Sequence, residues 1–150
     1  MAEQSLISRF ATTVLGGAVR KGFEVASKAG RLAFSYQDVS CQTQIYQKER
    51  GLKVDIWRKK DENGLLPVVF YIHGGAFKSL SKDTHWPMGV QFARSGFLTF
   101  VIDYRLAPKY PCPAALLDVM DAYHWICRNA SQFGGDPERL AIAGESAGAN

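Results

Sequence analysis

GESAGAN, residues 144–150, is the stretch that decides the fold, because it spells G-x-S-x-G directly after the apolar run Leu140 to Ala143. A buried strand followed by this pattern is typical of a nucleophile elbow, where the chain turns sharply from a strand into a helix. The two glycines remove Cβ atoms that would collide in the tight turn, and the serine hydroxyl is left exposed above the sheet. The sequence therefore predicts Ser146 as a catalytic nucleophile.

The base and the acid that this serine needs are expected to lie outside this sequence. A serine hydroxyl is a poor nucleophile until a base takes its proton. In a fold with this elbow the acid and the histidine follow the serine in chain order, and only four residues follow Ser146 in the 150-residue sequence. We therefore expect the fold to be cut off just after the elbow, with the acid and base in residues beyond 150 or in a partner.

Length and composition predict one ordinary globular domain. With 47% hydrophobic residues, 150 residues suffice to bury about 70% of the unfolded surface. The net charge is +4, but 18 basic residues are interspersed with 14 acidic ones. Even the densest basic group, at 48–60, is interrupted by Glu49 and Asp55. This pattern favours a solvated surface over a phosphate-binding patch, so we expect no nucleic-acid partner.

The cysteines and the N-terminus bear on the cellular compartment of the protein. Cys41, Cys112 and Cys127 have no metal-like spacing, and an odd number does not suggest a disulfide framework. We expect no metal, no cofactor and a reducing compartment, hence the cytoplasm. The N-terminus has no basic n-region, and its longest apolar stretch is broken by glycines and an arginine at 16–20. Neither a signal peptide nor stable membrane insertion is therefore predicted.

The first 35 residues differ in pattern from the rest. Apolar residues recur at three- and four-residue spacing from Leu6 to Val19, which predicts an amphipathic helix weakened by the pair at 16–17. Packing on its own domain is the favoured interpretation of its apolar stripe. A lid over an active-site mouth and a membrane-surface helix stay open.

From Tyr36 onward the period changes to that of strands. Residues 52–56 alternate apolar and charged side chains, which predicts a strand with one wet face, and turn residues follow at 61–64. The runs 68–72 and 97–102 are apolar on both faces, as in strands buried in a parallel sheet.

One helix is predicted between the runs 68–72 and 97–102, and another after the second of these runs. Residues 85–94 form the first, ended by Ser95-Gly96, and Pro113 opens the second, which runs to Cys127 and is stopped by the residues at 134–137. The order is hairpin, strand, helix, strand, helix, strand, elbow. This order predicts a doubly wound α/β fold.

A second functional element, HGGA at residues 73–76, follows the buried strand at 68–72. A tetrahedral intermediate carries negative charge on the former carbonyl oxygen, which preorganised N–H groups stabilise. We assign these donors as the N–H groups of Gly74, Gly75 and Ala147, and loss of one would cost roughly 3 to 4 kcal/mol of transition-state stabilisation.

Taken together, the motifs resemble those of the hormone-sensitive-lipase-like carboxylesterases of the α/β-hydrolase fold. The similarity runs from about Tyr36 to the end and rests on HGG at 73–75, DYRLAP at 103–108, Pro111, GDP at 135–137 and GESAGAN at 144–150. It implies a mostly parallel sheet, an oxyanion hole with Gly74, Gly75 and Ala147, and Ser146 as nucleophile. It also implies a helical cap segment within residues 1–35 and the N-terminal half of a catalytic domain at 36–150.

Four positions depart from the family's pattern. Ala76 stands where a third glycine is frequent, Glu145 where aspartate is usual, Lys109 where an acid is common and Ala149 where a glycine is common. These departures bear on substrate preference and not on the chemistry.

The remaining polar residues near the motifs receive structural roles. We expect His73 to shape the oxyanion loop, His85 to lie at the surface or pocket rim, and His124 to be a core or boundary residue of its helix. Asp103 precedes Tyr104-Arg105 in a segment that resembles the family's structural motif, so an ion-pair or turn-stabilising role is expected for Asp103 and Arg105. Glu145 is interpreted as a polar neighbour of the elbow.

The function that these features favour is hydrolysis of a small-molecule carboxylic ester, esterase-like or lipase-like, through a serine acyl-enzyme. A formamidase or peptidase on the same fold stays open, since an oxyanion hole does not distinguish an ester from an activated amide. The alternative of another class is a catalytically inactive fold, a pseudoenzyme or binding module. A homo-oligomer also stays open.

Overall fold

The computed structural model describes residue 18 and residues 21–27, 29–31 and 36–150. The chain divides into two units, Met1–Phe34 and Ser35–Asn150. The described residues of the first unit are helical. Most of the apolar residues on which the N-terminal helix was predicted, from Leu6 to Val14, lie outside the described residues. Within the described part of the chain, no helix combines the length and the apolar character needed to cross a membrane.

The second unit is built on a five-stranded mixed sheet with the order β1-β2-β4-β3-β5. The pairs β1–β2 and β2–β4 are antiparallel, while β3 pairs in parallel with both β4 and β5. The strands are β1 (Val39–Gln47), β2 (Leu52–Lys59), β3 (Leu66–Ile72), β4 (Leu98–Ile102) and β5 (Gly135–Gly144). The predicted hairpin is β1–β2 with its turn at 48–51, whereas the turn residues at 61–64 connect β2 to β3.

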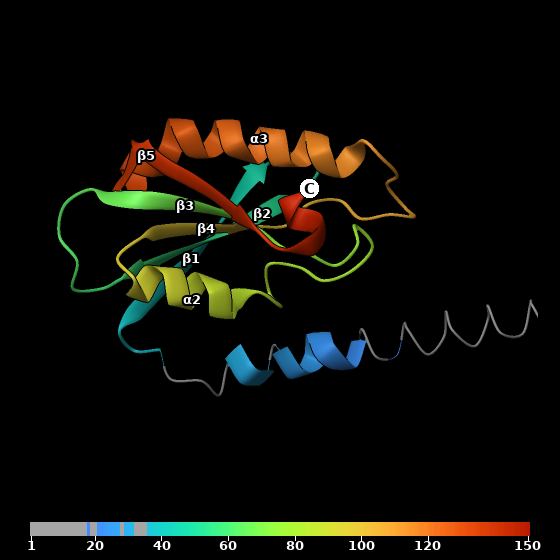
Figure 1. Ribbon diagram of the computed structural model, residues 1–150, viewed down its shortest axis with the longest axis horizontal. Coiled ribbons are helices and arrows are strands. Elements are labelled where there is room, and N and C mark those ends of the chain that lie inside the picture. Colours follow the sequence, from blue (N-terminus) through green and yellow to red (C-terminus); the bar gives the residue numbers. More distant parts are fainter. Residues whose placement is uncertain (1–17, 19–20, 28, 32–35) are drawn as a thin grey trace, which may run out of the picture. The chain divides into compact units, whose positions relative to one another are not determined.

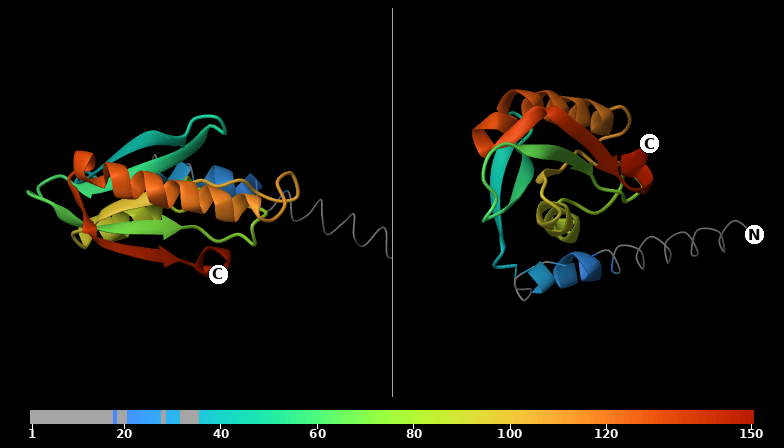
Figure 2. Two further views of the ribbon diagram at one scale, coloured as in Figure 1. Left: turned by 90° about the horizontal axis from the view of Figure 1, so that it is seen from above. Right: turned by 60° about the vertical axis from the view of Figure 1, so that its left-hand side comes forward.

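Two helices cover opposite faces of this sheet (Figure 1 and Figure 2). On one face α2 (Trp86–Arg94) packs through Val90 and Ala93 against side chains such as Val69. On the other, α3 (Ala114–Asn129) packs through Ala122 and Ile126 against Phe70 and its neighbours. Because successive strand residues point to opposite faces, the continuously apolar strands β3 and β4 feed both cores. The predictions for both helices and for both buried strands are confirmed.

The helix α3 corrects one prediction. Its buried residues recur at every fourth position, at Ala114, Asp118, Ala122 and Ile126. This narrow stripe leaves His124 exposed, so its prediction as a core or boundary residue is wrong. The large apolar residues Leu116, Leu117 and Met120 are exposed as well.

The strand β5, which leads into the elbow, differs from the strand predicted there. It begins at Gly135, five residues earlier than the predicted run, and the short 3-10 helix η1 (Ala130–Phe133) separates it from α3. In the described part of the sheet β5 pairs with β3 and has no second neighbour (Figure 2). Ile142 is therefore 59% exposed, and the prediction of a buried strand before the elbow is wrong for this chain.

Candidate active site

Ser146 lies at the tip of a sharp turn after β5. Glu145 is still extended, with φ −128° and ψ 147°, whereas Ser146 has φ +49°, in the left-handed region. The chain then enters the 3-10 helix η2 (Ser146–Ala149), and Gly148 N donates to Glu145 O at 2.8 Å. A positive φ at a residue other than glycine is strained and persists where the surroundings fix it. This is the geometry of a nucleophile elbow, with an exposed serine.

The two motif glycines have the steric role predicted for them. A Cβ on Gly144 would collide with the Gly148 carbonyl oxygen, and one on Gly148 would collide with the Ile72 carbonyl oxygen. The turn thus folds back onto the end of β3, at the point where the oxyanion loop begins. Only glycine permits this approach.

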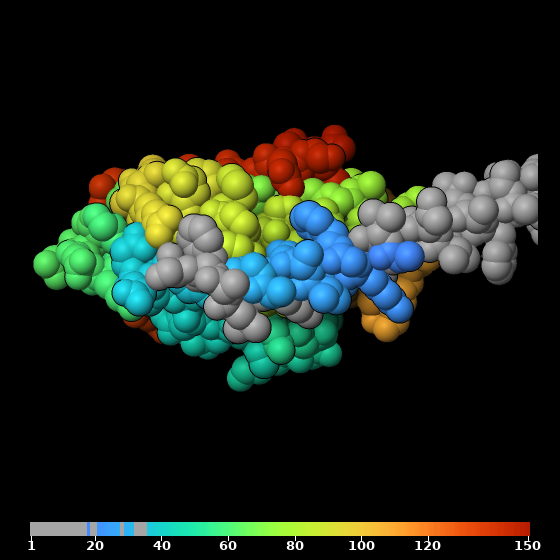
Figure 3. Space-filling model, turned by 90° about the horizontal axis from the view of Figure 1, so that it is seen from below, coloured from blue at the N-terminus to red at the C-terminus, as the bar shows by residue number. Residues whose placement is uncertain are grey.

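The loop at 73–79, called the oxyanion loop here after the role predicted for its glycines, follows β3 and lies against the elbow. A Cβ built on Gly74 would be 3.3 Å from Ser146 Cβ and 3.0 Å from Glu145 O, so the structure brings these residues together. Gly75 has φ +111°, and its carbonyl oxygen accepts bonds from the N–H groups of Lys78 and Ser79 at 3.0 and 3.1 Å. Ala147, the third assigned donor, is buried beside this loop. Figure 3 shows the elbow (red) at the surface next to the yellow-green residues of the loop and α2.

His73 is buried at the start of the loop. Its Nδ1 donates to Gly74 O at 2.7 Å, and its ring stacks on Tyr104 with centroids 4.3 Å apart. The Tyr104 hydroxyl donates to His73 O at 2.7 Å. Burial lowers the pKa of His73 to about 4, so its imidazole is neutral at pH 7. These contacts fix the loop where it leaves β3.

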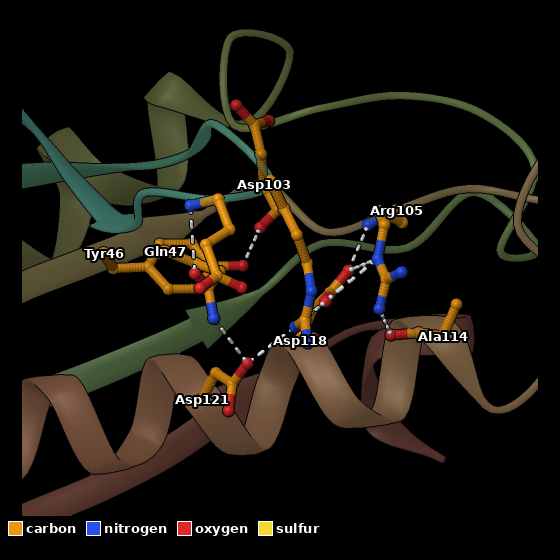
Figure 4. A network of polar contacts seen from close by, with 9 residues as sticks. Tyr46, Gln47, Asp103, Arg105, Ala114, Asp118 and Asp121 are labelled. Atoms are coloured by element: carbon orange, nitrogen blue, oxygen red, sulfur yellow. Dashed lines mark hydrogen bonds and ion pairs between the residues drawn. The ribbon is translucent and has the colours of Figure 1, made fainter.

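Asp103 and Arg105, the sequence neighbours of Tyr104, make two separate sets of polar contacts (Figure 4). Asp103 Oδ1 accepts the Lys82 N–H at 2.9 Å, and its carbonyl accepts the Tyr46 hydroxyl at 2.5 Å. Burial raises the pKa of Asp103 to about 6. Arg105 instead pairs through Nε with Asp118 of α3 at 2.8 Å.

His85 is the residue whose surroundings the sequence did not predict. It was expected at the surface or pocket rim, but it is buried at the N-cap of α2, and its Nε2 lies 2.6 Å from Glu145 Oε1. A separation of 60 residues leaves no local pattern that could have indicated this pair. From the sequence, Glu145 was interpreted only as a polar neighbour of the elbow and was not paired with His85.

A cavity of about 470 Å³ lies beside the elbow. Its wall is mostly apolar and includes Ala147 and Gly148 of the elbow, Phe77 of the oxyanion loop, and Leu116 and Val119 of α3. Ligand sites are concave and predominantly apolar, with a few polar groups at one end. Among the described residues, no group of three or more His, Cys, Asp and Glu side chains could hold a metal ion.

Comparison with known proteins places this geometry in a family. Residues 69–150 match the family model described as the alpha/beta hydrolase fold. Carboxylesterase NlhH of Mycobacterium tuberculosis is 46% identical over 86 residues, which are 57% of this chain and 27% of that protein. Versiconal hemiacetal acetate esterase of Dothistroma septosporum is 39% identical over 99 residues, or 65% of this chain and 30% of that protein.

Solved structures agree with the sequence relatives. Esterase LipW from Mycobacterium marinum superimposes with a TM-score of 0.77 and 33% identity, covering 88% of this chain and 43% of that one. A bacterial heroin esterase gives a TM-score of 0.79 at 29% identity, with 88% and 43% covered. The chain thus spans about a quarter of the curated relatives and less than half of the solved esterases. It belongs to the hormone-sensitive-lipase-like carboxylesterases of the α/β-hydrolase fold.

Proposed function

We propose that the protein containing this chain hydrolyses small carboxylic esters through a serine acyl-enzyme. Ser146 Oγ attacks the ester carbonyl carbon while a base takes its proton. The tetrahedral intermediate then collapses, and the alcohol leaves with that proton. Water attacks the acyl-enzyme in the same way and releases the acid. The observation that carries the proposal is the left-handed Ser146 at the tip of the turn, with Gly74 packed against it.

The oxyanion hole of this proposal consists of the N–H groups of Gly74, Gly75 and Ala147. The loop residues follow β3 and the elbow residue follows β5, two adjacent parallel strands whose carboxyl ends meet at the same edge. Support comes from the short approach between Gly74 and Ser146 and from the burial of Ala147. Donors held in place before the reaction stabilise the developing charge without reorganisation.

We further propose that the base and the acid are supplied by residues outside this 150-residue sequence. His73 and His85 hydrogen-bond the Gly74 carbonyl, the Ser81 carbonyl and the Glu145 carboxylate, and His124 is an exposed residue of α3. The relatives that match are more than twice as long as the matched region. An in-frame continuation after the Asn150 codon that encodes an Asp or Glu and then a His would support this.

The substrate class follows from the cavity. Its apolar wall suits an ester with an apolar acyl or alcohol group, and two of the relatives are named a carboxylesterase and a versiconal hemiacetal acetate esterase. A short-chain p-nitrophenyl ester is therefore the appropriate first substrate. The cytoplasmic location predicted from the cysteines stays part of the proposal.

The test uses the full-length protein that contains this sequence. We expect a fluorophosphonate probe to label Ser146 and p-nitrophenyl butyrate to be hydrolysed, with both activities abolished by Ser146→Ala. The matched control is Ser131→Ala, which removes another exposed serine hydroxyl and should leave both activities unchanged. A full-length protein with no labelling and no esterase activity would favour the non-catalytic alternative. Cleavage of an anilide or formamide in preference to esters would favour the formamidase or peptidase.

A further inference from the structure

The contact between His85 and Glu145 joins the two halves of the candidate site. Glu145 directly precedes Ser146, and its backbone carbonyl accepts the Gly148 N–H inside the elbow. His85 lies at the end of the segment that continues from the oxyanion loop into α2. Their side chains meet at 2.6 Å, between a 53% exposed carboxylate and a buried imidazole.

Hydrogen bonding on the far side of the imidazole fixes where its protons lie. His85 Nδ1 lies 3.0 Å from Ser81 O and 2.9 Å from Thr84 Oγ1. The Thr84 hydroxyl already donates to Ser81 O at 2.7 Å, so both neighbours act as acceptors toward Nδ1. We therefore assign a proton to Nδ1.

The near side then requires a second proton. A carboxylate has only acceptor sites, and a neutral imidazole with its proton on Nδ1 has only a lone pair on Nε2. A separation of 2.6 Å between Nε2 and Oε1 is consistent only with a proton between them. Such charge-assisted bonds are shorter and about twice as strong as neutral ones.

The two ionisable rings beside His85, those of His73 and Tyr71, are neutral. The His85 ring stacks on His73 with centroids 5.3 Å apart, and His73 stacks on Tyr104 in turn. Because burial lowers the pKa of His73 to about 4, the ring next to His85 is neutral. Tyr71, whose ring centroid is 6.1 Å from that of His85, is kept neutral by burial, which raises its pKa to about 12.

We propose that His85 is a positioning residue for Ser146, since its imidazole hydrogen-bonds the Glu145 carboxylate and so holds the nucleophile elbow against the oxyanion loop. The proposal rests on the proposed function, in which Ser146 is the nucleophile. It accounts for how a left-handed serine is held in a turn that follows β5, an edge strand of the described sheet. A small displacement of such a group can cost about 100-fold in rate.

The experiment measures kcat and KM for p-nitrophenyl butyrate and the rate constant of fluorophosphonate labelling in the full-length protein. We expect His85→Ala and Glu145→Ala each to lower kcat and the labelling rate by about 100-fold with little change in KM. The double variant should lose no more than either single variant, because both remove the same contact. His124→Ala, which removes the exposed histidine of α3, is the matched control and should keep the wild-type rates.

His85→Gln separates positioning from base catalysis. Glutamine can donate an N–H to Glu145 but cannot take the proton of a serine, so a positioning role predicts recovery of at least about tenfold over His85→Ala. Should His85→Ala fail to fold, as judged by its far-UV circular dichroism, Glu145→Ala and His85→Gln still decide the question. Glu145→Ala at the wild-type rate, fully additive losses, or a glutamine variant as slow as the alanine variant would each overturn the proposal. Absence of wild-type labelling at Ser146 is a different result, which would overturn the proposed function and this inference with it.

Discussion

Burial of the Asp103 carboxyl group near the site makes the free energy of unfolding depend on pH. Burial raises its pKa to about 6, while an unfolded chain gives an aspartate pKa of about 3.9. Between pH 4 and pH 6 the folded protein therefore binds the proton more tightly than the unfolded chain. The contribution of Asp103 to the free energy of unfolding is fully present below about pH 4, decreases up to about pH 6, and then levels off.

The variant Asp103→Asn tests the direction of this pH dependence of stability. Asparagine keeps an oxygen that can accept the Lys82 N–H, but it has no proton to lose in this range. We expect the stability of wild type relative to the variant to be greater at pH 4 than at pH 7, by about 2 to 3 kcal/mol, in urea unfolding at the two pH values. Asp61→Asn, at an exposed aspartate, corrects for the loss of one carboxylate. A difference of the opposite sign would show that the carboxylate is stabilised in its ionised form.

The residue-scale predictions from sequence succeeded where chemistry is local. Gly144, Ser146 and Gly148 lie within five residues, so the steric demands of one turn could be anticipated from their spacing. The contact of His85 with Glu145 could not, because it depends on how the segment before α2 packs against the end of β5. The assignment of catalytic roles to these residues remains a prediction for the labelling experiments.

Between elements, Asp118 connects three segments of the second unit. It is completely buried on α3, where it accepts bonds from Arg105 after β4 at 2.8 Å and from Arg50 of the β1–β2 turn at 2.8 Å (Figure 4). It also accepts the Arg105 backbone N–H at 2.9 Å. One carboxylate thus ties the hairpin, the loop after β4 and α3 together.

Removing this carboxylate should cost far more than removing its neighbour. We expect Asp118→Ala to lower the free energy of unfolding by about 3 to 5 kcal/mol, because two guanidinium groups lose a buried counter-charge. Asp121→Ala removes a 40% exposed partner of Arg50 and should cost less than about 1 kcal/mol. Equal costs in thermal or urea unfolding would show that the network is not centred on Asp118.

Element predictions from sequence depended on how completely each segment is buried. The strands β3 and β4 were found because both faces are apolar, and α2 and α3 because their ends carry clear stop and start residues. The run before the elbow was predicted as only 140–143, since the polar residues of 136–139 conceal that β5 already pairs with β3 at Gly135. The exposed position of His124 was missed because α3 buries a narrow stripe that includes an aspartate, while its apolar residues Leu116, Leu117 and Met120 are exposed.

At the scale of the whole molecule, the described sheet of the second unit has two edge strands, β1 and β5, and β5 is the one that leads into the elbow. In the described residues β5 is ten residues long and pairs on one side only, with Ile142 59% exposed. On α3, Leu116, Leu117 and Met120 are also exposed. A long open edge next to apolar surface is a template for pairing with another chain.

We therefore expect the 150-residue chain, expressed by itself, to self-associate or to stay partly molten. Light scattering after size exclusion should give masses above that of one chain, and near-UV circular dichroism should be weak while 8-anilinonaphthalene-1-sulfonate binds. Ile142→Lys places a charge on the open strand and should reduce association, as edge lysines do in natural sheets. Lys53→Ile, on a strand paired on both sides, is the opposite exchange away from that edge and should leave association unchanged. A monodisperse monomer that melts in one sharp transition would contradict the prediction, because it would mean that the packed faces of α2, α3 and the sheet stabilise the unit without cover for β5.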